Sequence, residues 1–160
     1  MSMVNLRPMR RSDKLAVMAI LRSTPEFLPH EVPIAEELID AFLNTPIESG
    51  YHVLVAETDG RVAGYVCFGE TPLTRGTWDV YWIAVEHGQQ GAGIGRALMA
   101  ATERDIRSSG GRLAVIETSS KSEYNKTRRF YGLLGYTEVA SIPDYYDVGD
   151  DIVILVKRLG

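Results

Sequence analysis

The chain has 160 residues and a formal net charge of -4, with 45% hydrophobic and 24% charged side chains. This length and balance are typical of one soluble folded domain, which we expect to span residues 1–160. The negative charge argues against nucleic acid as the main partner. No apolar run approaches the ~20 residues that cross a membrane. The first residues also lack the apolar stretch that a secretion signal contains.

Apolar periodicity and turn residues predict seven strands and four helices, and their order gives a mixed α/β fold. The strands are expected at residues 4–9, 52–57, 61–68, 77–85, 112–118, 137–142 and 151–159. The helices are expected at residues 13–23, 34–44, 93–109 and 125–134. Ser12 or Asp13 would cap the first helix, which would bury Leu15, Met18 and Ala19 along one side.

Several strands carry signals for how they connect. Asp59 and Gly60 lie between two apolar runs, which is a strong hairpin signal. The strand at 77–85 is apolar on both faces, so we expect a central strand with a parallel, right-handed crossover to 112–118. Cys67 lies within an apolar strand, where we expect a small buried side chain. A single cysteine excludes an internal disulfide, which suits a reducing cytoplasm.

Three glycines, Gly91, Gly93 and Gly95, stand where the third predicted helix begins. Glycine lets backbone N–H groups approach a bulky anion, and a helix N-terminus favours negative charge, so the turn predicts a phosphate-bearing ligand. The spacing does not fit a P-loop, and the dinucleotide fingerprint fails because Arg96 or Leu98 occupies the position of its third small residue. The alternative is a tight strand-to-helix connection without a ligand.

The pattern that fits is Q-x-x-G-x-G, formed by Gln90, Gly93 and Gly95. It resembles the pyrophosphate-binding motif of the GNAT acetyltransferase superfamily, over a stretch from about residue 50 to 159. The resemblance implies a central mixed sheet of about seven strands flanked by four helices, with acetyl-coenzyme A as the acyl donor. It also implies that the donor contacts Ile83, Ala84, Val85, Gln90, Gly91, Ala92, Gly93, Ile94, Gly95, Arg96 and Asn125.

Residues 130–136, FYGLLGY, match a second motif of that superfamily. The resemblance assigns Tyr131 as the acid that protonates the departing coenzyme A thiolate. A neutral phenol with a pKa near 10 can serve a thiol with a pKa near 8.5. The alternative is that Tyr131 only packs beside Thr127 and Leu134. Relatives often have Asn seven residues before this tyrosine, where this chain has Tyr124, so Asn125 would have to take the contact.

The attacking amine must lose a proton, because a free alkylamine is mostly protonated at neutral pH. Asp79 falls where several relatives place a general-base glutamate, and its apolar neighbours Trp78 and Val80 favour proton uptake. Tyr81 lies on the same face, and Asp79 would act directly or through water. Glu117, near the end of the next strand, is the second candidate. The alternative for Asp79 is a paired or solvated charge.

The segment 143–151 places Tyr145 and Tyr146 among four aspartates, in what we expect to be the loop between the last two strands. Aromatic rings with carboxylates suit a cationic amine, so Tyr81, Tyr145 and Tyr146 are candidate acceptor-binding residues. A small-molecule amine, an amino acid or a peptide N-terminus is the expected acceptor. A solvated hairpin turn explains the segment as well.

The leading interpretation is an acetyl-coenzyme A-dependent N-acetyltransferase. Direct transfer is favoured because no Cys–His pair is evident for a covalent intermediate. The alternative is a non-catalytic acyl-coenzyme A-binding sensor or regulatory module. No cluster of residues has metal-ligand spacing, so no metal is expected. A homodimer is expected only by analogy with similar proteins.

Overall fold

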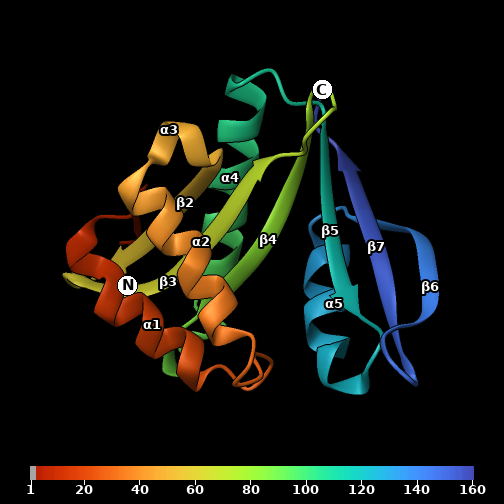
Figure 1. Ribbon diagram of the computed structural model, residues 1–160. Coiled ribbons are helices and arrows are strands. Elements are labelled where there is room, and N and C mark those ends of the chain that lie inside the picture. Colours follow the sequence, from red (N-terminus) through yellow and green to blue (C-terminus); the bar gives the residue numbers. More distant parts are fainter. Residues whose placement is uncertain (1–2) are drawn as a thin grey trace.

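The computed structural model describes residues 3–160, so the first two residues of the expected domain lie outside it. Seven strands form one sheet in the order β1-β2-β3-β4-β5-β7-β6 (Figure 1). The strands are β1 (Asn5–Pro8), β2 (Tyr51–Thr58), β3 (Arg61–Glu70), β4 (Thr77–Val85), β5 (Leu113–Ser119), β6 (Thr137–Asp147) and β7 (Asp150–Arg158). The helices are α1 (Lys14–Ser23), α2 (Val32–Asn44), α3 (Pro46–Ser49), α4 (Ile94–Ser108) and α5 (Asn125–Leu133). The predicted mixed α/β fold with seven strands is confirmed.

The four predicted helices are present as α1, α2, α4 and α5, and the described residues contain a fifth that was not predicted. The additional helix, α3, has four residues between Pro46 and Gly50, where the chain turns left-handed at φ +72°. A single turn is too short to give a period of apolar residues. The sixth strand is also longer than predicted: β6 continues to Asp147, so Tyr145 and Tyr146 lie in a strand rather than in a loop.

Helices cover both faces of the sheet, with α1 and α2 on one side and α4 and α5 on the other (Figure 1). Each face has its own hydrophobic cluster, and Cys67 is buried in the cluster beneath α1 and α2, as predicted. Of the three residues predicted on the buried side of α1, Met18 is buried, whereas Leu15 is 85% exposed and Ala19 is also exposed. The other buried residues of the helix are Val17, Ile20 and Leu21. No described helix is both long and apolar enough to cross a bilayer.

The start of α1 is fixed by an ion pair rather than by the expected cap. Asp13 forms no side-chain cap on α1. Its carboxylate instead accepts hydrogen bonds from Arg7 at 2.7 and 3.0 Å and from the Arg10 backbone N–H at 2.7 Å. Arg7 also binds Glu57 on β2 at 2.8 Å, so this group joins β1, β2 and the beginning of α1.

A second cluster of polar side chains connects α4 to β7. Glu103 is buried on α4, where it accepts hydrogen bonds from the Tyr136 hydroxyl at 3.0 Å and from Lys157 on β7 at 2.8 Å. A buried carboxylate is stable only when it is paired in this way. The contact therefore fixes α4 relative to β7, at a distance from the turn where α4 begins.

The sheet is antiparallel except at its centre, where β4 and β5 run parallel. This ladder has three residue pairs and ends at Asp79–Val115, whereas β5 and β7 pair over seven residues. Beyond Asp79 the two strands diverge toward their carboxyl ends (Figure 1). The result is a V-shaped opening in the sheet, with Asp79 at its apex.

Candidate functional site

The edge of β4 that borders the opening has backbone groups without a strand partner. The Glu86 N–H donates to the Ala63 carbonyl, and Ala84 likewise faces β3. Because alternate residues of a strand direct their backbone groups to opposite sides, those of Ile83 and Val85 face the opening. The three residues predicted to line the donor site are thus not equivalent: Ala84 is turned toward β3.

A β-bulge at Tyr81 changes the direction of β4 just beyond the apex. Cys67 pairs with Trp82 and Phe68 pairs with Val80, so Tyr81 is an extra residue on β4. Such bulges bend a strand and increase its twist. The bulge thus lies where β4 begins to leave β5.

The carboxyl end of β4 leads to the N-terminus of α4 through the glycine turn. Gly91 and Gly93 have φ values of +86° and +82°, which L side chains rarely adopt. A Cβ built at either residue would meet no atom within 4 Å, so both border open space. No side chain caps α4, and the N–H groups of residues 94–96 have no partner within residues 3–160. This arrangement provides a cradle for an anion.

The third glycine of the turn has a different role. A Cβ on Gly95 would lie 3.2 Å from Cζ of Phe130 on α5, so Gly95 allows the two helices to approach closely. The side chain of Ile94 is buried in the core, which leaves only its backbone for a ligand. The side chains of Gln90, Ala92 and Arg96 are exposed beside the cradle.

The candidate base residues share the face of the sheet that carries α1 and α2. Asp79 and Tyr81 lie on this face of β4, and Glu117 lies on it two residues beyond Val115, the partner of Asp79. The Thr71 hydroxyl donates to Asp79 at 2.8 Å. Trp78 and Val80 belong to the opposite face, because neighbouring side chains of a strand alternate. These two neighbours in sequence therefore do not pack around the Asp79 carboxylate.

The phenol of Tyr81 lies among these carboxylates. Burial, followed by the charge of Asp79, raises the pKa of Tyr81 to about 12, and Glu117 contributes in the same direction. The ring packs edge-on against Tyr51 at a centroid distance of 5.7 Å. Tyr81 therefore stays a neutral hydrogen-bonding group at any physiological pH.

Tyr131 approaches from the opposite face, on α5. Its side chain is 5% exposed and belongs to the cluster against which Ile83 and Val85 pack. Its hydroxyl has no hydrogen-bond partner in the described chain, yet it is not among the fully enclosed unpaired atoms, which are Tyr65 Oη and Trp78 Nε1. Burial raises the pKa of Tyr131 above its ordinary value. The phenol is thus neutral and free to donate.

The residues at the start of α5 are engaged in ways that the sequence motif did not reveal. The Asn125 amide oxygen accepts a hydrogen bond from Arg128, whose guanidinium also binds the Ser119 carbonyl. The Tyr124 hydroxyl donates to the Glu26 carbonyl, 98 residues away, at 2.7 Å. Since the acceptor is a backbone oxygen, no residue type at position 26 signals this contact.

Tyr145 and Tyr146 form an edge-to-face pair with centroids 5.0 Å apart. Both are about half exposed on β6. Burial raises the pKa of Tyr146 to about 12, and the charge of Glu117 is the next largest cause. Tyr146 therefore lies within range of the charge of the same carboxylate as Tyr81.

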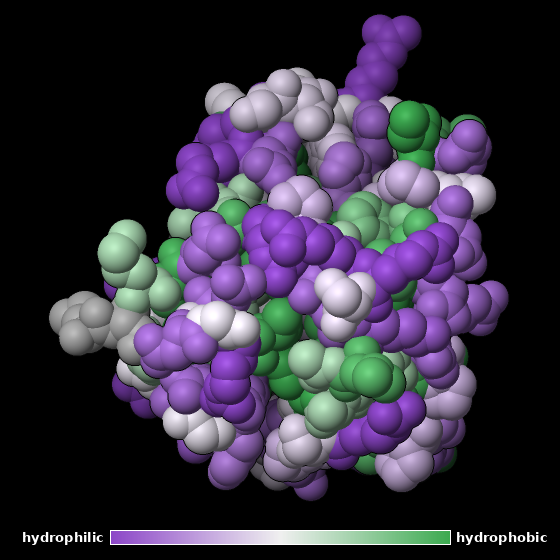
Figure 2. All heavy atoms as spheres, turned by 90° about the vertical axis from the view of Figure 1, so that its left-hand side faces the viewer, coloured by the Kyte–Doolittle hydropathy of each residue, from purple (hydrophilic) through white to green (hydrophobic). Residues whose placement is uncertain are grey.

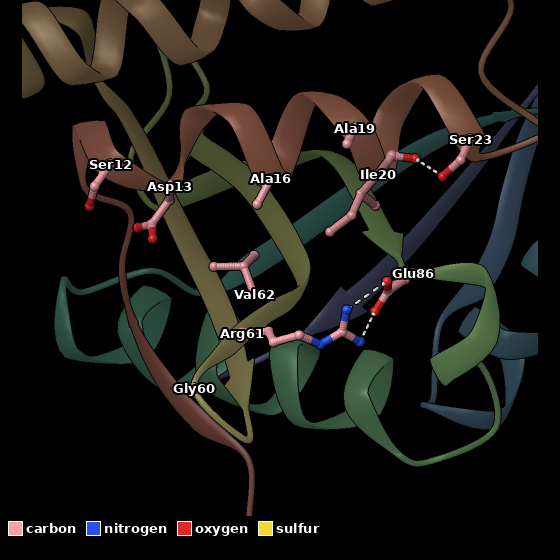
Figure 3. A pocket seen from close by; sticks show the side chains of 10 residues that line it. All are labelled: Ser12, Asp13, Ala16, Ala19, Ile20, Ser23, Gly60, Arg61, Val62 and Glu86. Atoms are coloured by element: carbon pink, nitrogen blue, oxygen red, sulfur yellow. Dashed lines mark hydrogen bonds and ion pairs between the residues drawn. The ribbon is translucent and has the colours of Figure 1, made fainter.

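Two cavities adjoin α1 and α2. One of about 620 Å³ separates α1 from the start of β3, with Ile20, Val62 and the Arg61–Glu86 ion pair on its walls (Figure 3). One of about 440 Å³ adjoins Phe27 and α2. Figure 2 shows hydrophilic residues over most of the side remote from β6 and β7, with hydrophobic ones in smaller patches. Within residues 3–160, no group of His, Cys, Asp or Glu has the arrangement of a metal site.

Comparison with known sequences supports the family assignment. The family described as "Acetyltransferase (GNAT) domain" matches residues 49–138, more than half of the chain. An uncharacterized N-acetyltransferase of Methanocaldococcus jannaschii is 31% identical over 105 residues, 65% of this chain and 64% of that protein. The L-methionine sulfoximine/L-methionine sulfone acetyltransferase of Salmonella typhimurium is 32% identical over 100 residues, 59% of this chain and 55% of that protein. The match thus spans less than two thirds of either relative.

Solved structures share the whole fold. A GNAT-family protein from Desulfovibrio desulfuricans superposes with a TM-score of 0.95 at 41% identity, covering 99% of this chain and 100% of that one. The yncA protein of Salmonella typhimurium, solved with acetyl-coenzyme A, gives a TM-score of 0.75 at 23% identity, covering 98% and 94%. With the family match and the geometry of the opening, these likenesses establish that the chain belongs to the GNAT acetyltransferase family.

Proposed function

We propose that this protein transfers the acetyl group of acetyl-coenzyme A directly to a primary amine. One observation carries the proposal: the unpaired edge of β4, at Ile83 and Val85, leads straight to the uncapped N-terminus of α4. An extended chain with amide groups suits the first feature, since it can pair with a free strand edge. A pyrophosphate suits the second.

The residues of the opening fit such a donor. Ile83 and Val85 would pair with its amides, and the open space above Gly91 and Gly93 would admit its phosphates. The exposed side chains of Gln90 and Arg96 would border the same anion. Two proteins of the same fold were solved with this type of ligand, the yncA protein with acetyl-coenzyme A and an aminoglycoside 6'-N-acetyltransferase with coenzyme A.

The donor would supply a reactive thioester, and the leaving thiolate needs a proton. Tyr131 is the proposed source, because its hydroxyl is neutral and unpaired and its ring belongs to the cluster against which Ile83 and Val85 pack. Burial that raises the pKa of the phenol would also raise that of a thiol at the same place, so the transfer stays feasible. The phenolate would regain its proton from solvent.

The acceptor amine needs to lose a proton before it attacks. Asp79 is the proposed base, because it lies at the apex of the opening on the face opposite to Tyr131. Thr71 fixes one carboxylate oxygen and leaves the other available, either directly or through a water molecule. Glu117 lies on β5 two residues beyond Val115, where its side chain is exposed, and it is the second candidate for the base.

We further propose that the acceptor is a cationic amine. Tyr81, Tyr146 and the carboxylates of Asp79 and Glu117 form an aromatic and acidic wall on the acceptor side. Such a wall attracts an ammonium group by charge and by cation–π contact. The relative from Salmonella typhimurium is named for L-methionine sulfoximine and L-methionine sulfone, and a protein of the same fold from Escherichia coli is named for an alanine of ribosomal protein S18. The cytoplasmic location, the single domain and the homodimer remain predictions.

Thermal unfolding with acetyl-coenzyme A, coenzyme A or NAD tests the donor assignment. We expect both coenzyme A compounds to raise the melting temperature and NAD to leave it unchanged, because a ligand that binds the folded protein and not the unfolded chain stabilises the fold. Release of free thiol with a panel of amines then separates a transferase from an acyl-coenzyme A sensor, which would bind without turnover. No shift with either coenzyme A compound would refute the proposal.

A further inference from the structure

The connection between α1 and α2, residues 24–31, contacts both sides of the V-shaped opening. On one side, the ring of Phe27 lies 6.1 Å from the ring of Trp82 on β4. On the other, the Glu26 carbonyl accepts the 2.7 Å hydrogen bond from Tyr124, in the short turn that follows β5. The segment therefore spans strands that have no backbone pairing beyond Asp79.

The segment is built as a unit with its own hydrogen bonds. Phe27 N–H donates to the Thr24 carbonyl at 3.0 Å, and Glu31 N–H donates to the Leu28 carbonyl at 2.9 Å. The Glu31 carboxylate returns a contact by accepting from Leu28 N–H at 3.2 Å. Because the turns hold their own shape, a contact at one end fixes the position of the whole segment.

The Tyr124 phenol is suited to a lasting contact. Burial raises the pKa of Tyr124 to about 12, and the charges of Glu31, Glu26, Asp150 and Glu123 act in the same direction. The phenol therefore keeps the proton that it donates to Glu26. The carboxylates of Glu26 and Glu31, both in the segment, therefore lie within range of the Tyr124 phenol.

We propose that Tyr124 is a positioning residue, which holds residues 24–31 across the opening and so completes the acceptor side of the site. This inference rests on the proposed function for its effect on the acceptor, but not for the contact itself. By the family resemblance, Tyr124 stands at the position of an asparagine that would contact the donor. In this chain the residue would serve the acceptor side instead.

Tyr124→Phe tests the proposal, because it removes the hydroxyl and keeps the ring. Tyr65→Phe is the matched control, since it also removes one phenol hydroxyl, and that hydroxyl has no partner in the described chain. Hydrogen exchange of the free protein should show the amides of Phe27 and Glu31 exchanging about 3- to 10-fold faster in Tyr124→Phe, the size expected for one neutral hydrogen bond. The control should match the wild type. Unchanged exchange in Tyr124→Phe would overturn the proposal.

Kinetics separate positioning from a general structural role. The amine with the highest wild-type turnover among putrescine, spermidine and glycinamide serves as the probe. Tyr124→Phe should raise its KM by about 3- to 10-fold, while kcat and the coenzyme A Kd stay within about twofold. Faster exchange with an unchanged acceptor KM would refute the role in the acceptor site. If wild-type protein fails to bind acetyl-coenzyme A, the proposed function fails, and the exchange result alone decides whether Tyr124 holds the segment.

Discussion

Replacing Gly93 by alanine is the sharpest test of the anion cradle. Gly93 has φ +82°, and a Cβ there would meet no atom within 4 Å, so the free protein bears only the cost of a left-handed residue. That cost is about 1–2 kcal/mol, and it should lower the melting temperature by about 2–8 °C in a protein of this size. The variant should therefore fold.

The effect on coenzyme A should be larger, because the new methyl group would enter the space assigned to the phosphates. Loss of one charge-assisted N–H to phosphate hydrogen bond is worth about 1.5–3 kcal/mol, or about 10- to 150-fold in Kd. Isothermal titration calorimetry with coenzyme A measures the Kd, and urea unfolding measures the stability. Folded Gly93→Ala protein with wild-type affinity would refute the assignment of the cradle.

Gly95→Ala is the matched control within the same turn. A Cβ at Gly95 would lie 3.2 Å from Cζ and 3.4 Å from Cε1 of Phe130, so the ring has to shift slightly. Alanine favours a helix over glycine by about 1 kcal/mol, which offsets the crowding, so stability should change by less than about 1 kcal/mol. The N–H of residue 95 is kept. The coenzyme A Kd should therefore stay within about threefold of wild type.

Three further substitutions have defined outcomes. Tyr131→Phe should lower kcat by about 100-fold without changing the coenzyme A Kd, and equal turnover would remove Tyr131 from the mechanism. Arg7 holds the pKa of Asp13 below its usual 3.8, so Asp13 stabilises the fold above that pH and loses this contribution as the pH falls through its lowered pKa. Asp13→Asn should cost about 1.5–3 kcal/mol in urea unfolding at pH 7 and should flatten the acid limb of the stability profile; an unchanged limb would contradict this. Tyr65→Phe removes an enclosed hydroxyl without a partner, so its free energy of unfolding should be unchanged or higher, and a loss above about 1 kcal/mol would indicate a bound water.

Some features of the fold follow from sequence patterns, and others depend on contacts that leave no pattern. The strand at 77–85 was predicted with the bounds that the structure has, because turn residues flank a clear apolar run. The bulge at Tyr81 was missed, since a strand that is apolar on both faces shows no alternation for an extra residue to break. The same reason explains why Leu15 and Ala19 were wrongly placed on the buried side of α1, whose sequence is apolar almost all round.

The candidate site likewise combines features that the sequence indicates with features that only the folded contacts show. Three glycines look equivalent in the sequence, yet the structure separates Gly91 and Gly93, with positive φ, from Gly95, which makes room for Phe130. The divergence of β4 from β5 leaves no signal in the sequence, because strand pairing is not encoded by the side chains at 83–85. The bond from Tyr124 to Glu26 was not predictable, since its acceptor is a backbone carbonyl in a distant segment.

The three-pair ladder between β4 and β5 also determines how the sheet would respond to a mechanical force. Force applied between β1 and β6, across the strands, acts on every ladder in series. The shortest of these ladders at the centre of the sheet would rupture first, since it has three residue pairs where β5 and β7 have seven. The sheet would then separate along the line on which the acetyl donor is proposed to lie. A bound donor that bridges the opening from β4 would increase the force needed to separate the strands.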